Sequence, residues 1–232
     1  MARKSFVGRL VGIVAWFFAG TLTLVVTVIV LLRFLDPPTT AFMVAHKVNH
    51  SDGKVIHQWV DYSRMSEWMP LAVVASEDQR FPDHWGVDFA AIRSALADYR
   101  AGDGLRGAST ITQQTAKNLF LWNGRSFVRK ALEAGLALGL EVFWPKQRIL
   151  EVYLNVAEFG PGIYGVEAAS RAYFGIGARD LSSSQAARLA AVLPNPKVLS
   201  VGNPSRYVWE RAAWVERQMR QLNGPGYLRG ME

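Results

Sequence analysis

The chain has 232 residues, of which 50% are hydrophobic and 19% are charged, a composition typical of a globular protein with a membrane segment and unlike a disordered chain. It contains no cysteine, which excludes disulfides, thiolate catalysis and zinc–thiolate sites. The formal net charge of +7 favours anionic partners, such as nucleic acid, phosphorylated molecules or acidic lipid headgroups, without choosing among them.

The first element along the chain is an apolar segment that predicts a transmembrane helix. Residues 10–32 carry no charged side chain, and about 20 residues are needed to cross a hydrocarbon core. A cleaved signal peptide is the alternative, but its apolar region would be shorter and would end in a small-x-small site, which is absent here. Arg3, Lys4 and Arg9 precede the span, so the positive-inside rule places residues 1–9 in the cytoplasm. The rest of the chain is then exported.

Residues 33–65 are predicted to form a juxtamembrane linker. Asp36-Pro37-Pro38 cannot continue a helix, and the stretch that follows is polar. It contains His46, His50 and His57, whose irregular spacing favours solvated side chains over a metal site. We therefore predict no metal ligands in this chain.

Residues 66–222 are predicted to form one mostly helical domain, followed by a C-terminal tail at 223–232. No stretch alternates at period two for long, which argues against an extensive sheet. Asp88 can cap a helix, and Pro145 can open one. Thr110-x-x-Gln113 and Ser182-x-x-Gln185 both have the form of a capping box, in which a hydroxyl and an amide satisfy free backbone groups at a helix start.

The first polar cluster follows an apolar run and contains Glu77, Asp78 and His84. Glu77 falls where a helix leaves the core, and partial burial raises the pKa of a carboxyl group toward the range that a general base needs. Adjacent helical residues point about 100° apart, so Glu77 and Asp78 are not expected to serve the same atom. The pattern favours Glu77 as a catalytic candidate, with one of the two acids structural and His84 fixing the loop. Solvation of a helix end is the alternative.

The second polar cluster lies at the start of a predicted helix and presents Thr110, Gln114 and Lys117 on one face. Free backbone N–H groups at a helix start, together with an ammonium group, make an anion site. Arg125 follows a predicted turn and can bring a second positive charge to the same anion. A capped surface helix is the alternative.

The third cluster places Glu133 three and four residues after Lys130 and Arg129, a spacing that ordinarily gives a surface ion pair. The mostly apolar run from Ala134 to Val142 follows directly, and it predicts that this helix passes through the middle of the domain.

Segments of the chain, in order, resemble the motifs of family 51 glycosyltransferases, the peptidoglycan glycosyltransferases. The resemblance runs from about residue 66 to residue 219. The matching segments are Glu77-Asp78-x-x-Phe81-x-x-His84-x-Gly86, Gly107-x-Ser109-Thr110-Ile111-x-Gln113-Gln114, Arg129-Lys130-x-x-Glu133, Lys146-x-x-Ile149-Leu150-x-x-Tyr153-Leu154-Asn155 and Arg188-x-Ala190 to Pro196.

This resemblance implies a mainly α protein, with one transmembrane helix and a lysozyme-like helical glycosyltransferase domain that has a small membrane-apposed subdomain. It places the general base on Glu77 and a second essential carboxylate on Glu133. It places the pyrophosphate contacts on Lys117 and Arg125. The other implied substrate-binding residues are Ser109, Gln114, Arg129 and Lys130.

The activity implied is the polymerisation of lipid II into β-1,4 glycan strands, with inversion at the anomeric carbon and release of undecaprenyl pyrophosphate. Cations of the protein or a divalent metal, Mg²⁺ or Mn²⁺, would stabilise the leaving group, and no other cofactor is expected. The location implied is the bacterial inner membrane with the catalytic domain in the periplasm. The expected protein partners are transpeptidases or proteins of the divisome or elongation machinery, whose identity the sequence does not reveal. Crosslinking is left to another protein, because no Lys-Thr-Gly follows the chance match Ser51-x-x-Lys54 to a transpeptidase nucleophile motif.

Other functions stay open on the sequence alone. A lytic enzyme of the same fold would cleave finished glycan, but it needs no pyrophosphate site. A non-catalytic membrane scaffold or a nucleic-acid binder would explain the positive charge, although the acids around Glu77 argue against nucleic acid.

Overall fold

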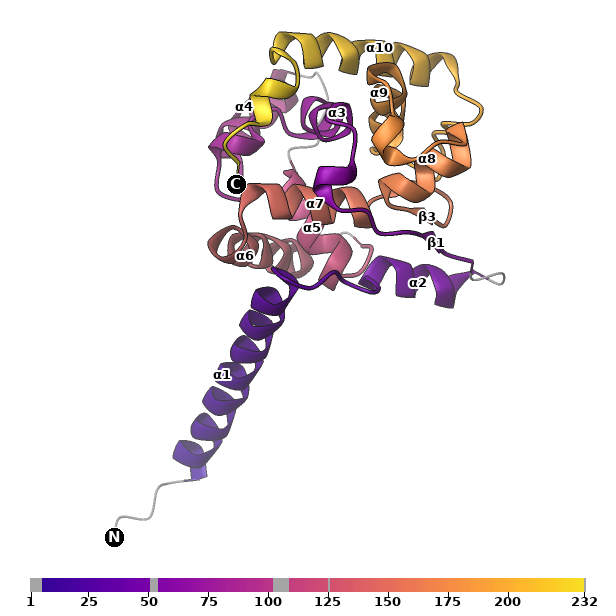
Figure 1. Cartoon of the computed structure of the whole chain (residues 1–232). Coiled ribbons are helices and arrows are strands. Elements are labelled where there is room, and N and C mark those ends of the chain that lie inside the picture. Colours follow the sequence, from indigo (N-terminus) through magenta and orange to yellow (C-terminus); the bar gives the residue numbers. More distant parts are fainter. Residues whose placement is uncertain (1–5, 51–53, 102–108, 125, 232) are drawn as a thin grey trace. The chain divides into compact units, whose positions relative to one another are not determined.

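The computed structural model describes residues 6–50, 54–101, 109–124 and 126–231 of the chain, which divides into two compact units, residues 1–37 and 38–232. The first unit consists of helix α1 (Phe6–Leu32), coloured indigo in Figure 1. The part from Gly8 to Leu32 is long and apolar enough to cross a membrane, with a mean hydropathy of 2.4. It contains the whole of the predicted span 10–32.

The second unit is mainly helical, as predicted (Figure 1). Its α-helices are α2 (Ala41–Asn49), α3 (Trp68–Glu77), α4 (Phe89–Ala101), α5 (Ile111–Phe120), α6 (Phe127–Phe143), α7 (Lys146–Val156), α8 (Val166–Phe174), α9 (Ser183–Val192) and α10 (Arg206–Gln221). Short 3-10 turns are η1 (Tyr62–Arg64), η2 (Phe81–Asp83), η3 (Ala178–Asp180) and η4 (Gly224–Leu228). The strands are β1 (Ile56–His57), β2 (Glu158–Gly160) and β3 (Ile163–Tyr164).

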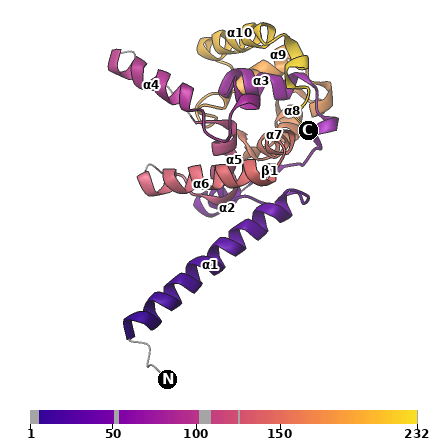
Figure 2. The same cartoon turned by 90° about the vertical axis from the view of Figure 1, so that its left-hand side faces the viewer.

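The helices of the second unit pack as two groups that share a core. Helix α3 packs against α9 and α10, while α5 packs against α6 and α7. Residues 69–75 of α3 and residues 152–156 of α7 are buried throughout, which explains why their sequences are nearly continuous apolar runs. Figure 2, turned by 90°, shows α4 and α6 extending to the same side of this unit.

Helix α6 lies at the surface, so the prediction that it passes through the middle of the domain is wrong. Only Glu133, Ala137 and Leu140 are buried on it, on the side that packs against α5 and α7. Phe127 and Val128 are 97% and 70% exposed. The apolar run therefore supplies side chains to two faces of α6. The inner face packs in the core, and the outer face is not covered by any of the described residues.

The segment predicted as a linker is folded. It contains α2, whose start is capped by the Thr40 hydroxyl, and β1, which joins a small sheet in the order β1-β3-β2. Strand β1 runs parallel to β3, with Ile56 opposite Ile163, and β2 runs antiparallel to β3. The prediction of solvated histidines is wrong for His46, which is buried, with its ring stacked on His50 and edge-on to the ring of Tyr164.

One buried side chain ties this segment to the helical core. Asn155 of α7 is fully buried, accepts from the Val60 N–H at 2.9 Å and donates to the Val60 carbonyl at 2.9 Å. Its own carbonyl lies 3.1 Å from His57 Nε2. The amide thus pairs with both backbone groups of Val60, as a neighbouring strand would.

Both predicted capping boxes are confirmed at the starts of α5 and α9. Asp88 caps α4 by accepting from the backbone N–H groups of Ala90 and Ala91 at 2.9 Å each. Thr110 does more than cap, because its hydroxyl also donates to the Gly86 carbonyl at 2.6 Å. This bond fixes the start of α5 against the loop that precedes α4.

Candidate active site

Glu77 is the last residue of α3 and is partly buried between α3 and α5. Its Oε2 accepts from Gln114 Nε2 at 3.1 Å, and its Oε1 accepts from the Ser76 hydroxyl at 3.2 Å. The Tyr153 hydroxyl donates to Gln114 Oε1 at 3.2 Å. Because the amide oxygen is taken by Tyr153, the amide nitrogen must face Glu77, so the two bonds fix the carboxylate from one side.

Burial raises the pKa of the Glu77 carboxyl above its ordinary value. The bond from Gln114, the charge of Arg211 and the bond from Ser76 oppose this rise, while the neighbouring Asp78 adds to it. Burial also raises the pKa of Tyr153, with the charge of Glu77 adding to the effect, so this hydroxyl stays protonated and remains a donor. A carboxylate with a raised pKa is a better proton acceptor near neutral pH than an exposed one.

Asp78 has a structural position, as expected for one of the two neighbouring acids. Its carboxylate lies 2.9 and 3.0 Å from Nε2 of His84, and both side chains are buried. It also accepts from the Ile111 N–H at 2.9 Å. Asp78 and His84 therefore join the end of α3 to the loop before α4 and to the start of α5.

A second carboxylate, that of the half-buried residue Glu141, stabilises that loop. Glu141 of α6 accepts from the Gly86 N–H at 3.0 Å, from the Thr112 hydroxyl at 2.6 Å and from Lys146 Nζ at 2.7 Å. Lys146 also donates to the carbonyl of His84. With a positive φ of 68° and the Glu141 side chain 3.1 Å from where a Cβ would lie, position 86 requires glycine.

Glu133 lies on the buried side of α6 and is only 2% exposed. Arg129 Nη1 lies 2.5 Å from Oε2 of this carboxylate, and Lys130 Nζ lies 2.5 Å from Oε1. Lys130 also donates to the Ser109 hydroxyl at 2.9 Å. The carboxylate therefore holds two cations of its own helix in place, and both of its oxygens are used by them.

Lys117 of α5 lies between the two glutamates. Burial lowers the pKa of its ammonium group, Glu133 and Glu77 raise it, and Arg129 and Lys130 lower it further. Among the described residues it forms no ion pair, and its Nζ lies 5.5 Å from the centre of the Phe42 ring. A partly buried, unpaired ammonium group beside two other cations is suited to an anionic ligand.

Two hollows adjoin these residues. A cavity of about 260 Å³ is lined by Glu77 together with Arg80 and Ser109. A second cavity of about 310 Å³ is lined by Gln114, Lys117 and Tyr153. Since Gln114 bonds to Glu77, the carboxylate is positioned between the two spaces.

The structure brings most of the predicted site residues together: Glu77 with Gln114, and Glu133 with Arg129, Lys130 and Ser109. Lys117 joins the two groups. Arg125 lies outside the described residues. The roles themselves remain predictions, because contact alone does not assign a chemical step.

Sequence reasoning predicted Gln114 as a site residue but missed two residues that support the arrangement around Glu77. Tyr153 falls in a motif that the resemblance covers, but nothing in the sequence assigned a role to its hydroxyl. Arg211 of α10 donates to the Ser76 carbonyl and hydroxyl at 3.3 Å each. No motif marks Arg211, and only the folded chain brings it to the end of α3.

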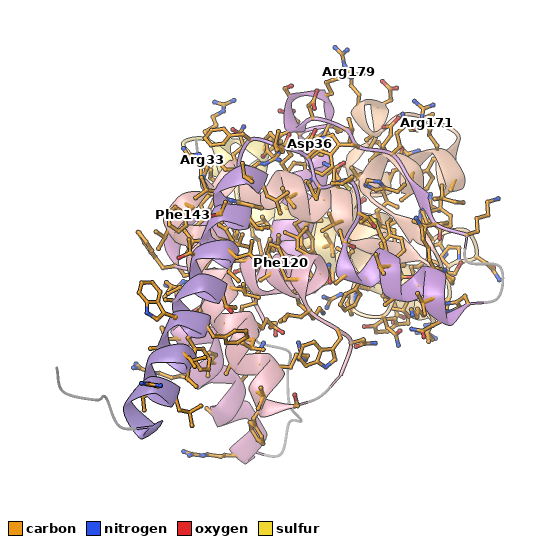
Figure 3. The ribbon with its side chains drawn as sticks, turned by 90° about the horizontal axis from the view of Figure 1, so that it is seen from below. Arg33, Asp36, Phe120, Phe143, Arg171 and Arg179 are labelled. Atoms are coloured by element: carbon orange, nitrogen blue, oxygen red, sulfur yellow. The ribbon has the colours of Figure 1, made fainter. Side chains whose placement is uncertain are left out.

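Part of the positive charge lies elsewhere. Arg171 of α8 pairs with Glu167 at 2.6 Å, and Arg179 of η3 is exposed. Figure 3 labels both at the outer edge of the second unit, and neither lines the two cavities beside Glu77. The net charge of +7 is therefore only partly a property of the candidate site.

The donor set beside Lys117 does not fit a resident divalent metal. Glu133 already contacts two cations, and the remaining groups around it are themselves cationic. Within the described ranges, no group of three or more His, Asp or Glu side chains has the arrangement to hold a metal ion. The described groups of this site that are suited to an anion are the cationic side chains.

Comparisons with known proteins agree with the motifs. The family model described as Transglycosylase matches residues 45–220. A biosynthetic peptidoglycan transglycosylase of Marinomonas sp. (strain MWYL1) is 60% identical over 98% of this chain and 97% of its own length. Proteins of the same description from Pseudomonas fluorescens (strain Pf0-1) and Shewanella frigidimarina are 50% and 60% identical over 97% and 85% of this chain, and over 94% and 84% of their own lengths. The chain therefore belongs to the transglycosylase family.

Proposed function

We propose that this chain polymerises lipid II into β-1,4 glycan strands for cell wall synthesis, with Glu77 as the general base. The observation that carries the proposal is the position of Glu77, a carboxylate held by Gln114 and Tyr153 between two cavities and next to the cations that surround Glu133. Family membership supports the same activity.

In the proposed reaction Glu77 accepts the proton of the 4-hydroxyl of the acceptor N-acetylglucosamine. The freed oxygen attacks the anomeric carbon of the donor N-acetylmuramic acid, while the bond from that carbon to the pyrophosphate oxygen breaks. Attack opposite the leaving group inverts α to β. Holding the two sugars on either side of a fixed carboxylate supplies the required alignment.

The negative charge that develops on undecaprenyl pyrophosphate needs cations in place before the reaction. Lys117, Arg129 and Lys130 are the described cations that meet this need, and Arg125 matches the family position for a further contact. Glu133 is proposed to orient Arg129 and Lys130, because both of its oxygens contact them. It has no free oxygen with which to protonate a leaving group that is already a stable anion.

We propose that α1 anchors the chain in the bacterial inner membrane, with the N-terminus in the cytoplasm and the catalytic unit in the periplasm. The basic residues before the span support this orientation. The exposed apolar side chains of α6, such as Phe127 and Leu138, support contact of this part of the unit with lipid. Crosslinking of the product would be left to transpeptidases.

The experiment that tests this function compares two substrates for the detergent-solubilised full chain. Lipid II should give long glycan strands, and finished glycan should stay uncut, because only synthesis needs the group of cations. Release of fragments from finished glycan, with no product from lipid II, would identify a lytic enzyme and contradict the proposal. Activity with added chelator and with added Mg²⁺ would show separately whether a metal contributes.

A further inference from the structure

The C-terminal part of the chain forms hydrogen bonds with the segment that carries Glu77. Arg211 of α10 contacts Ser76, Gln218 of the same helix accepts from Gln79 Nε2 at 3.0 Å, and the Tyr227 hydroxyl of η4 donates to the Gln79 carbonyl at 2.7 Å. These contacts are made by residues more than 130 positions away from residues 76 and 79 in the sequence. The end of α3 is therefore positioned from α10 and η4 as well as from α5.

Arg211 is the charged member of this group. Its Nη2 lies 3.3 Å from both the Ser76 carbonyl and the Ser76 hydroxyl, and that hydroxyl lies 3.2 Å from Glu77 Oε1. The ring of Trp214, one turn further along α10, lies 4.7 Å from the guanidinium carbon and limits where the guanidinium can go. A short chain of contacts thus runs from Arg211 through Ser76 to Glu77.

Arg211 lies where a positive charge can offset the unfavourable position of the Glu77 carboxylate. Glu77 is at the C-terminus of α3, where the helix dipole and the free carbonyls disfavour a negative charge. A cation at this end compensates both for the carbonyls and for the carboxylate. Arg211 Nε is buried and has no hydrogen-bond partner among the described residues, so its hydrogen bonding is not optimised for stability alone.

We propose that Arg211 is a positioning residue of the transfer reaction, which through Ser76 holds the Glu77 carboxylate in place and supplies the positive charge that keeps it ionised. This inference rests on the proposed role of Glu77 as the base. The other charged or titratable groups that interact electrostatically with Glu77 are Asp78 beside it, Lys117 from α5 and Tyr153 from α7. Among the described residues of α9 and α10 that pack against α3, Arg211 is the cation that opposes the effect of burial.

The test is the pH dependence of lipid II polymerisation by the full chain carrying Arg211→Gln. The base must be ionised, so activity falls on the acid side as Glu77 is protonated, and loss of the nearby cation should move this acid limb upward by about half to one pH unit. At pH values on this acid limb the rate should fall about 3- to 10-fold, and it should recover on the plateau above the limb, with little change in KM. Arg217→Gln removes an equal charge from an exposed position of α10 and should leave the profile unchanged.

An acid limb of Arg211→Gln that superimposes on that of the unchanged chain would overturn the inference, as would an equal loss of rate at every pH. If Arg211→Gln does not fold, Ser76→Ala tests the contact chain without altering the charge, and kcat should fall 3- to 10-fold at constant KM. An unchanged kcat in Ser76→Ala would also contradict the inference. If Glu77→Gln is inactive and the pH profile of Arg211→Gln is not shifted, the proposed function stands and only the role of Arg211 is overturned. If the unchanged chain makes no glycan from lipid II, the proposed function and the role of Arg211 are both overturned.

Discussion

At the scale of single residues, Glu77 shows what a sequence can and cannot predict. Its place at the end of an apolar run predicts a partly buried carboxylate, and the structure places it there. The partners that make this carboxylate useful, Gln114, Tyr153 and Arg211, come from three other helices. Local periodicity carries no information about such long-range contacts, so the motifs predict Glu77 and Gln114 as site residues but not the contact between them or the positions of Tyr153 and Arg211.

Glu77→Gln should make the protein more stable at neutral pH. Because burial raises the pKa of Glu77 in the folded state, folding is favoured when this group is protonated, and that contribution is lost as the pH rises through the folded-state pKa. A neutral amide avoids this loss, so Tm at pH 7.5 should rise by on the order of 2 °C. The difference should vanish near pH 4, where the native side chain is protonated as well. Thermal unfolding at both pH values measures it, and a lower Tm at pH 7.5 would contradict the burial argument.

Glu133→Gln tests the proposed orienting role. Arg129 and Lys130 would lose the carboxylate that holds them, so polymerisation should slow on the order of 100-fold. Glu210→Gln removes the partner of Arg206 in an exposed ion pair and is the matched control, expected to change the rate less than about twofold. Near-normal polymerisation by a folded Glu133→Gln protein would remove the basis for the orienting role.

At the scale of elements, the helix starts were the most predictable features and the region before α3 the least. Capping boxes depend on residues within one turn, so Thr110 and Ser182 could be recognised directly. Residues 33–65 resemble a linker in sequence because contacts with distant residues stabilise their fold. Examples are the packing of α2 against α5 and the hydrogen bond between Asn155 and Val60. The prediction that α6 passes through the middle of the domain is wrong for a related reason. An apolar run does not reveal which faces of a helix pack against other helices.

Asn155→Ala should destabilise the catalytic unit by about 2–4 kcal/mol. The substitution leaves both the N–H and the carbonyl of buried Val60 without a partner and opens a small cavity in α7. Urea unfolding measures the change, with the exposed Asn203→Ala as a control that should stay within about 0.5 kcal/mol. Equal effects of the two substitutions would show that the amide does not stabilise the backbone at Val60.

At the scale of the whole molecule, the chain divides into a unit whose helix is long and apolar enough to cross a membrane and a compact unit of residues 38–232. If lipid II and the growing strand are both held in the membrane by polyprenyl chains, an anchor confines enzyme and substrate to the same surface and raises their effective concentration. The apolar span follows from length and hydropathy alone, whereas the helical class of residues 66–222 follows from capping residues, the lack of long period-two alternation and the family resemblance.

Removal of residues 1–37 should therefore weaken catalysis more than folding. In vesicles with limiting lipid II the rate should fall on the order of 100-fold, while the Tm of the remaining unit changes little. An unrelated apolar span fused at residue 38 should restore most of the rate. Equal activity of the shortened and full-length chains in vesicles would show that the anchor plays no part in catalysis.

The most direct test of the account is the initial rate of lipid II polymerisation by the full-length chain and by its Glu77→Gln variant. If Glu77 is the base, the folded variant should be slower by about 10²–10⁴-fold at every pH, since an amide cannot accept the proton. A folded Glu77→Gln protein that polymerises lipid II within about tenfold of the unchanged chain would contradict the central claim.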